Sequence, residues 1–344
     1  MRIFPILFSA IFLASAAAGC GGNSAGQPSS EASGAPVAQA DPEADPVIIE
    51  RFDRAVMAYD SLDRHGRDSI VKVYAPVLLF EGSDGGDIPV DDLMAALRAS
   101  STQKVFGPDV ERYLPDLSAI ETSLGQLRAN MARELPSLQF PRHVYGILTP
   151  YAQSIVAVAD TSLLVGLNHY LGVTYLGYQG YVQDYMLRFK VPGRVAYDVA
   201  EALLSLRYPY HSSDGSTLLS RMLYDGAILA AMLRVVPGST LQSVMGYDDD
   251  QMRWAADNEK AVWSELARRQ LLYSTDPSVA ARLLAPAPSS AILTPDAPGR
   301  ICRYMGCRLI ESYLRRNPES SPERFLADSL WLSSSTLRQS GYGE

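Results

Sequence analysis

The spacing of apolar side chains predicts two early helices and a change of character after them. Residues Val47 to Arg64 and Leu114 to Leu135 carry apolar residues at helical spacing, and a proline closes the second segment. Three short runs follow, Val144 to Leu148, Ser154 to Val158 and Ser162 to Val165, rich in β-prone residues and separated by turn residues. These runs predict a small sheet whose strands are joined mostly by hairpins.

Helical spacing returns after the predicted sheet. One segment places apolar or small residues on a single face, at Leu219, Met222, Leu223, Gly226, Leu229, Ala230 and Leu233. A glycine on such a face predicts that the backbone of a neighbouring element packs closely against Gly226.

Two more helices are expected before the C-terminus. Asp248 and Gln251 have the spacing of a capping box, which predicts a helix that begins there and runs to Leu272. Another helix is expected after Pro298-Gly299-Arg300. The predicted fold class is therefore α-rich α+β, with helices around a small, mostly antiparallel sheet.

The first twenty residues have the pattern of a bacterial lipoprotein signal. Arg2 supplies a positive charge, an apolar run extends from Ile3 to Ala18, and Ala17-Ala18-Gly19 stands directly before Cys20. A helix that spans a membrane needs about 20 apolar residues, more than this run offers. We therefore predict that residues 1–19 are a signal peptide and that Cys20 is the lipid attachment site. The alternative is an ordinary secretory signal with an incidental cysteine.

Residues 20–46 are predicted to form a disordered tether. They are dominated by Gly, Ser, Ala, Pro, Asp and Glu and contain no Lys, Arg or aromatic residue, so they cannot bury enough apolar surface to offset chain entropy. Residues 47–344 then form a single globular domain. Gly21 stands where an aspartate would mark retention at the inner membrane, which favours the outer membrane and a domain in the periplasm.

Composition excludes one class of partner. Apolar residues make up 47% of the chain, which allows a sizeable core, and the formal net charge is −8, part of it in the acidic tether. The domain carries no basic stripe, so nucleic acid is not an expected partner.

Two cysteines remain beyond the predicted lipid site. Cys302 and Cys307 lie five residues apart in a segment of helical character, so their side chains point in different directions. We predict that both are buried core residues, with a redox pair as the alternative.

The domain contains no strong catalytic motif. HExxH, CxxC, GxSxG, a phosphate-binding glycine loop and a calcium loop are all missing from residues 47–344. The histidines His65, His143, His169 and His211 are not spaced to place two imidazoles on one metal ion. The sequence therefore predicts no catalytic residue, no metal and no cofactor, and His169 is expected to be a packed or half-exposed ring.

Four blocks resemble the GldB family of gliding-motility lipoproteins. They are SIVAVADTSLLVGLNHYLG (154–172), TLLSRMLYDGAILAAML (217–233), MGYDDDQMRWAADNEKAVWSELARRQLLYSTD (245–276) and APGRICRYMGCRLIESYL (297–314). Together with the lipobox and the tether, their order and spacing carry the likeness over most of the chain. The resemblance implies a cell-envelope lipoprotein linked to the gliding machinery and its secretion apparatus, with no established enzymatic activity.

The resemblance also implies a distant, degenerate relative of zinc metallopeptidases (a zincin-like domain). In such enzymes an HExxH helix is followed by a second helix that supplies a glutamate ligand. The corresponding helices are Gly193 to Leu206, which has Asp198 and Glu201 but no histidine, and Thr217 to Leu233, which has Asp225. Two of the three ligands that a zinc site needs are therefore missing.

Several residues are candidates for a vestigial cleft between these two helices. Asp198, Glu201 and Asp225 face one another if the helices pack as in the peptidases; the alternative is that they are solvated charges or caps. Arg300 is predicted to fork onto one of these carboxylates in an architectural pairing. A tyrosine-rich segment forms either a contact surface or ordinary packing over the sheet edge, through Tyr170, Tyr175, Tyr178, Tyr181 and Tyr185.

The predicted function is a non-catalytic binding or assembly role in the cell envelope. The expected partners are the membrane, through the lipid, and other envelope proteins. One alternative is a divergent envelope hydrolase that uses the Asp198, Glu201 and Asp225 carboxylates on a peptide or glycan. A second is a lipoprotein that binds a small ligand, which requires a deep apolar pocket.

Overall fold

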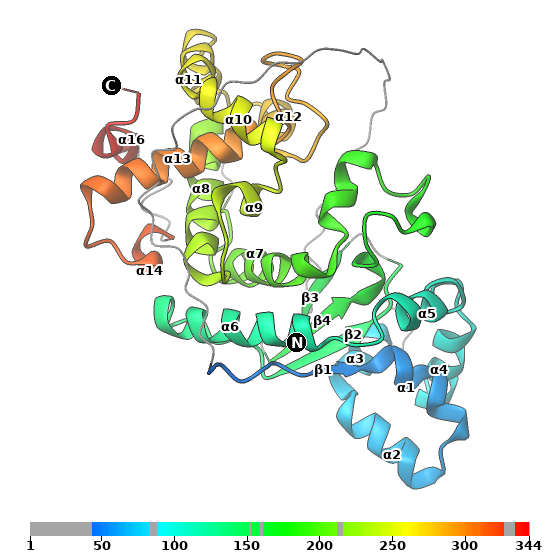
Figure 1. Ribbon diagram of the computed structural model, residues 1–344. Helices are drawn as coiled ribbons and strands as arrows, with labels where there is room; N and C mark the ends of the chain where they lie inside the picture. Colours follow the sequence, from blue (N-terminus) through cyan, green and yellow to red (C-terminus); the bar gives the residue numbers. More distant parts are fainter. Residues whose placement is uncertain are drawn as a thin grey trace. The chain divides into compact units, whose positions relative to one another are not determined.

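The computed structural model describes residues 43–82, 88–150, 153–158, 161–211, 216–326 and 334–343 (Figure 1). The predicted signal peptide, Cys20 and nearly all of the predicted tether lie outside the described residues. Among the helices that are described, none is both long enough and apolar enough to cross a membrane.

Four strands form one mixed sheet in the order β1-β2-β4-β3. They are β1 (Ile49–Arg51), β2 (His143–Ile147), β3 (Ile155–Val158) and β4 (Ser162–Gly166). β1 runs parallel to β2, β2 runs parallel to β4, and β3 pairs antiparallel with β4. The α-rich α+β class is confirmed, whereas the prediction of a mostly antiparallel sheet is wrong.

Burial explains why β4, rather than β3, lies beside β2. Every residue of β4 is buried, whereas β3 has no fully buried residue. A strand that is covered on both faces belongs in the interior of a sheet, and a partly covered strand fits an edge. The predicted β3–β4 hairpin is present, but it places β3 on the outside.

β1 falls inside the first predicted helix. That segment instead contains β1, α1 (Phe52–Ala58) and a 3-10 turn (Tyr59–Ser61). The amide of Val47 donates to the carbonyl oxygen of Glu121 at 3.0 Å, and the amide of Ile49 donates to the carboxylate of Glu121 at 2.9 Å. Pairing with β2 and with Glu121 therefore overrides the local helical pattern.

Helices cover both faces of the sheet, and successive strand residues point alternately to the two layers. Tyr145 and Ile147 pack into the smaller core, and Val144 and Val165 pack into the larger one. The smaller core is closed by α1, α2 (Arg64–Val73), α3 (Ala75–Glu81) and α4 (Val90–Ala99).

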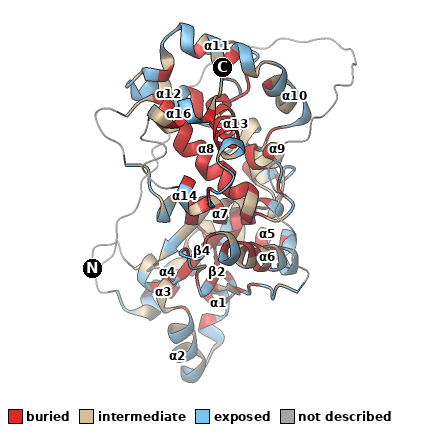
Figure 2. Ribbon diagram, turned by 90° about the vertical axis from the view of Figure 1, so that its left-hand side faces the viewer, coloured by how far each residue is buried: buried red, intermediate tan, exposed pale blue. Residues whose placement is uncertain are grey.

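The larger layer holds the long helices α6 (Ser118–Glu134), α7 (Val195–Arg207), α8 (Leu218–Val235) and α13 (Ile301–Arg316). Nearly every residue of α8 is buried, as the red ribbon in Figure 2 shows. α6 confirms the helix predicted after Leu114, and α13 confirms the one predicted after Arg300. The other described helices are α5 (Ser101–Tyr113), α9 (Leu241–Met245), α10 (Asp249–Asp257), α11 (Glu259–Arg268), α12 (Pro277–Leu284), α14 (Pro322–Phe325) and α16 (Ser334–Ser340).

α8 and α13 meet backbone to backbone at two glycines. A Cβ atom on Gly226 would clash with the backbone carbonyl of Gly306, and a Cβ atom on Gly306 would clash with the backbone of Met222. The close approach predicted at Gly226 is confirmed. The same helix pair buries Cys302 and Cys307, which are both free thiols, as expected for core cysteines.

The predicted capping box is present, but the helix that it opens is shorter than expected. The Asp248 side chain accepts from the amide of Gln251, and the Gln251 side chain accepts from the amide of Asp248. α10 then ends at Asp257, and the side-chain amide of the next residue, Asn258, donates to the carbonyl of Trp254 at 2.9 Å. This local bond competes with helix continuation, so α10 and α11 are separate helices.

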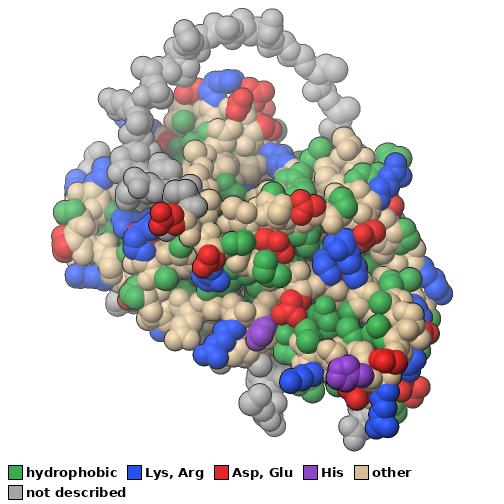
Figure 3. Space-filling model, turned by 60° about the horizontal axis from the view of Figure 1, so that its bottom comes forward, with side chains coloured by type: hydrophobic (Ala, Val, Ile, Leu, Met, Phe, Trp, Pro, Cys, Tyr) green, Lys and Arg blue, Asp and Glu red, His purple; other side chains and the backbone are tan. Residues whose placement is uncertain are grey.

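The surface mixes charges of both signs with apolar groups. On the face shown in Figure 3, Lys and Arg side chains are interspersed with Asp and Glu side chains, and hydrophobic groups lie between them. That face therefore offers no continuous basic stripe to a phosphate backbone.

Candidate functional site

Three helices meet at the acidic residues that the sequence singles out. α7 carries Asp198 and Glu201, and α8 carries Asp225. α13 packs on α8 and brings Arg303 to the same place. Electrostatic interactions link Glu201 to both aspartates. We name this group of four, Asp198, Glu201, Asp225 and Arg303, the carboxylate cluster.

Arg303 pairs with two members of the carboxylate cluster. Its Nη2 lies 2.6 Å from Oε1 of Glu201, and its Nε lies 3.9 Å from Oδ2 of Asp225. Arg221, one turn before Asp225 on α8, lies 3.7 Å from the other oxygen of that carboxylate. Arg303 is only 7% exposed, and a buried charge is costly unless it is paired. Two carboxylates are thus balanced by two guanidinium groups.

Asp198 has a different environment within the carboxylate cluster. The Tyr170 hydroxyl donates to Oδ2 of Asp198 at 2.9 Å, and Nη2 of Arg194 lies 3.5 Å from Oδ1. Burial raises the pKa of Asp198 to about 6, although Arg194 and the Tyr170 hydrogen bond oppose that shift. Asp198 is therefore a carboxyl group that can hold a proton at mildly acidic pH.

A lysine and a histidine extend this polar network. Nζ of Lys190 lies 2.9 Å from Nδ1 of His169, which ends the 3-10 turn after β4. Burial lowers the pKa of Lys190, and the negative charge of Asp198 opposes that shift. His169 is partly buried, in agreement with the prediction of a packed or half-exposed ring.

The carboxylate oxygens of the carboxylate cluster fit guanidinium groups better than a metal ion. In the part of the chain that the structure describes, no group of three or more His, Cys, Asp or Glu side chains is placed to hold a metal. Glu201 and Asp225 both interact with Arg303, and a second cation placed between them would be repelled by that guanidinium.

Arg300 does not make the predicted pairing with a carboxylate. Among the described residues Arg300 forms no ion pair. Arg303, one turn further along, makes the carboxylate contacts that were predicted for Arg300. Arg300 precedes α13 with a φ of 66°, in the left-handed region that is uncommon outside glycine. Its Nη1 donates to the carbonyl of Met245 at 3.4 Å, and its guanidinium lies over the Phe189 ring, 5.4 Å from the centroid.

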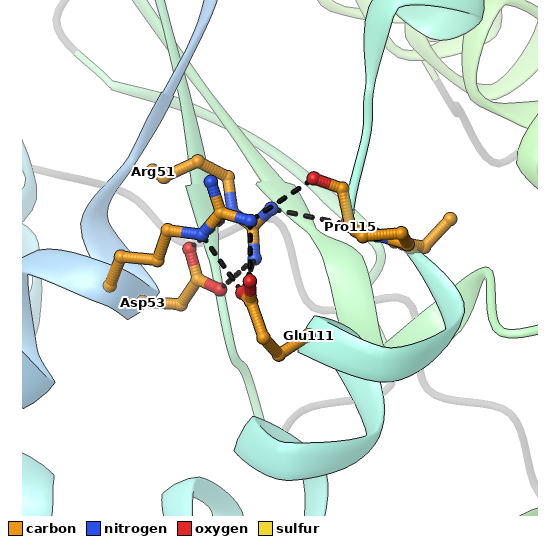
Figure 4. Close-up of polar contacts among 6 residues, drawn as sticks. Arg51, Asp53, Glu111 and Pro115 are labelled. Atoms are coloured by element: carbon orange, nitrogen blue, oxygen red, sulfur yellow. Dashed lines mark hydrogen bonds and ion pairs between the residues drawn. The ribbon is translucent and has the colours of Figure 1, made fainter.

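A second ion-paired group fastens β1 and α1 to α5 (Figure 4). Arg51 binds Asp53 through two hydrogen bonds of 2.8 and 2.6 Å. Arg54 binds Glu111 in the same bidentate way, at 2.8 and 2.7 Å. Both arginines also donate to backbone carbonyls just beyond α5. Bidentate pairs fix geometry as well as charge, so this group has a structural role at the start of the domain.

Buried tyrosines hold the segment between β4 and α7. Tyr175 donates to Asp109 on α5 at 2.6 Å, and Tyr178 donates to the carbonyl of Asn168 at 2.7 Å. The rings of Tyr175 and Tyr178 pack edge to face, with their centroids 4.9 Å apart. For these two residues, and for the buried Tyr170, the packing interpretation is the correct one.

The same segment exposes three apolar side chains. Tyr181 is 89% exposed and Leu176 is 73% exposed, and Val173 is also exposed. Single exposed apolar residues are ordinary, but these three lie close together in sequence on a segment that Tyr175 and Tyr178 hold in place. We name Val173, Leu176 and Tyr181 the apolar tip.

The sequence-based prediction missed Arg303, although one signal for it was available. Arg303 lies three residues before Gly306 and therefore shares its helix face. A glycine on that face indicates close packing against another helix, and a charge there needs a buried partner. Arg194 and Lys190 gave no comparable signal, since their positions depend on how α7 meets the sheet.

One comparison with known proteins gives a match. A family model described as gliding motility protein GldB matches residues 37–344. No curated protein and no solved structure matches the chain significantly. The implied likeness to zinc metallopeptidases therefore has no support from a solved structure.

Proposed function

The chain belongs to the GldB family of gliding motility proteins, and from this premise we propose that it is a non-catalytic lipoprotein that binds other envelope proteins. The observation that carries the proposal is the contact of Arg303 with Glu201 and Asp225. A hydrolase that used these carboxylates would need them to face a substrate. Here they take part in a charge-balanced, mostly buried group.

The apolar tip supplies the proposed contact surface. Leu176 and Tyr181 extend into solvent, while the neighbouring Tyr175 and Tyr178 are fixed by hydrogen bonds. Such an arrangement presents apolar and aromatic area on a segment that its neighbouring tyrosines already hold in place, which lowers the cost of ordering the segment on binding. This supports a binding role for the segment.

The family is one of lipoproteins, which places the chain in the cell envelope. We propose further that Cys20 carries the lipid, that the protein resides at the outer membrane, and that the domain lies in the periplasm. The small residues before Cys20 and the glycine after it support this assignment. Metabolic labelling with a palmitate analogue tests it: Cys20→Ser should abolish labelling, and labelling that persists would contradict the lipid assignment.

Site-specific crosslinking in the full-length protein tests the binding role. A photoreactive amino acid at Tyr181 should crosslink to a defined envelope protein. The same amino acid at Tyr273, which is also well exposed but lies elsewhere in the chain, serves as the matched control. Leu176→Ser should weaken the Tyr181 crosslink. Identical crosslinks from Tyr181 and Tyr273, or peptide cleavage by the purified protein that a chelator abolishes, would overturn the proposal.

The second candidate function is an envelope hydrolase that uses Asp198, Glu201 and Asp225 on a peptide or glycan. The observation that favours it is the raised pKa of Asp198, about 6, because a general acid works best when its pKa lies near the ambient pH. The test is Asp198→Asn in a folded variant. Loss of a measurable hydrolytic activity would support this candidate over binding, and no activity in the unaltered protein would reject it.

We also propose that α7 and α8 are a relict of a metallopeptidase scaffold. The supporting residues are Asp198 and Glu201 on one helix and Asp225 on the next, with the Arg303 guanidinium in place of a metal ion. Elemental analysis of protein purified without chelators should find no stoichiometric zinc. Stoichiometric zinc would contradict the proposal that the scaffold has lost its metal, and it would favour the hydrolase.

A further inference from the structure

A narrow pocket lies beside Arg300, at the N-terminus of α13. It is lined by the segment before α7, by the α9–α10 junction and by the loop that leads into α13. Its lining includes Arg188, Phe189, Gly246, Gln251, Gly299 and Arg300. Neither the carboxylate cluster nor the apolar tip contributes to it.

Arg300 brings an uncompensated positive charge to this pocket. The residue is 8% exposed, and its Nε has no hydrogen-bond partner within the described part of the chain. The contacts that it does make are neutral: the 3.4 Å hydrogen bond to the Met245 carbonyl and the Phe189 ring. Buried guanidinium groups are normally paired with an anion, and no ion pair among the described residues gives Arg300 one.

The start of α13 adds to the positive potential. No side chain caps this helix, and its first turn contains no acidic residue. The N-terminal end of a sixteen-residue helix carries a partial positive charge, which favours an anion in the adjoining pocket. The helix end and the unpaired Arg300 guanidinium thus favour the same kind of ligand.

Arg188 supplies a second guanidinium whose charge is already offset. It donates to Gln251 and to the carbonyl of Gly246, and it lies 3.6 Å from Asp248. With Asp248 set against Arg188, the charge left over is that of Arg300. One negative charge balances it, which favours a carboxylate over a dianionic phosphate.

We propose that this pocket binds a carboxylate group, gripped by Arg300 and received at the N-terminus of α13. The carboxylate belongs either to a free small organic acid or to the C-terminal residue of a polypeptide. The assignment does not depend on the binding role of the apolar tip, and each can fail without the other.

Titration of the full-length protein with acetate, followed by the NMR signals of the arginine Nε–H groups, tests the proposal. The Arg300 signal should shift in a saturable way, and the signal of Arg253, an exposed arginine on α10, should not. Arg300→Met should weaken acetate binding by at least about tenfold, and Arg253→Met should leave it unchanged. No saturable shift at Arg300 in the unaltered protein would overturn the proposal, even if the Arg300 variant fails to fold.

Tri-alanine and its C-terminal amide identify the source of the carboxylate. Stronger binding of tri-alanine than of acetate, with no binding of the amide, points to a polypeptide C-terminus. Binding of acetate without binding of tri-alanine points to a free acid. Tighter binding of inorganic phosphate than of acetate would overturn the choice of a carboxylate.

Discussion

Arg303 and Arg300 lie one helical turn apart at the start of α13, and their environments differ sharply. Both side chains are buried, but Arg303 contacts two carboxylates, whereas Arg300 contacts a carbonyl and an aromatic ring. Arg303 lies inside the helix, on the face that meets α8, while Arg300 is the residue before the helix begins. The comparison teaches that the partner helix, and not the residue type, decides whether a buried arginine is structural or available to a ligand.

Removal of Arg303 should have the largest effect. Arg303→Met leaves Glu201 and Asp225 without their main counter-charge in a largely buried position, which should cost about 3–5 kcal/mol of unfolding free energy. Urea denaturation measures this loss. Adding Glu201→Gln and Asp225→Asn should restore most of the stability, because no buried carboxylate is then left without its counter-charge, and Arg221 is partly exposed. A cost below about 1 kcal/mol would show that Arg303 is not a structural partner.

A methyl group added at the crossing of α8 and α13 should cause the second-largest loss of unfolding free energy. Gly226→Ala places a Cβ against the backbone of Gly306, so α8 and α13 must separate, at a cost of about 2–3 kcal/mol. The matched control is Gly193→Ala, where an added Cβ meets no atom within 4 Å and the expected change is within about 0.5 kcal/mol. Equal effects at the two glycines would contradict the close crossing.

The raised pKa of Asp198 makes a testable contribution to the pH dependence of stability. The folded-state pKa of Asp198 is about 6, above its ordinary value of 3.8, so the folded state holds the proton more tightly. Stability should therefore fall as pH rises from about 4 to about 6, and the loss should persist above that window.

Asp198→Asn removes the Asp198 contribution to this dependence and leaves those of Asp225 and Glu81, whose pKa values burial also raises. Relative to the unaltered protein, the variant should gain about 1–3 kcal/mol in unfolding free energy between pH 4 and pH 7. Tyr170→Phe should shift the window upward, because the Tyr170 hydroxyl favours the ionised carboxylate. Parallel stability curves for Asp198→Asn and the unaltered protein across this pH range would refute the assignment.

Removal of Arg300 should have the smallest effect. Arg300→Met leaves no carboxylate behind and removes an unpaired buried charge, so unfolding free energy measured in a buffer without organic acids should fall by no more than about 1 kcal/mol. Thermal or urea unfolding alongside Arg303→Met gives the direct contrast. Similar losses for both variants would mean that the two arginines do not differ as described.

Parts of the fold could be predicted because their signals are local. The close packing at Gly226 follows from a glycine on an apolar helix face, and the Asp248–Gln251 capping box follows from spacing alone. The order of the strands could not be predicted in the same way. It depends on which strand is covered from both sides, although the continuous apolar run of β4 is typical of such a strand.

The candidate site shows the same limit. The sequence placed Asp198, Glu201 and Asp225 on two helices, and the structure has them on α7 and α8. It could not show which arginine reaches them, because that depends on how α13 crosses α8. The sequence predicted that Arg300, in the turn before α13, pairs with one of the carboxylates, but the close crossing of the helices brings Arg303 to Asp225 instead. Contacts between helices far apart in sequence are set by packing that no single segment encodes.

The fastening of β1 has a mechanical consequence. Tension applied along the chain from its N-terminal side first meets the bonds of Asp45 and Val47 to α6 and then reaches β1. β1 pairs with β2 over three residues, and Arg51 and Arg54 bind the Leu114 carbonyl and Glu111 at its C-terminal end. A pull directed along β1 loads these bonds together in shear, so the domain should yield at this corner first, well before force reaches the α8–α13 crossing.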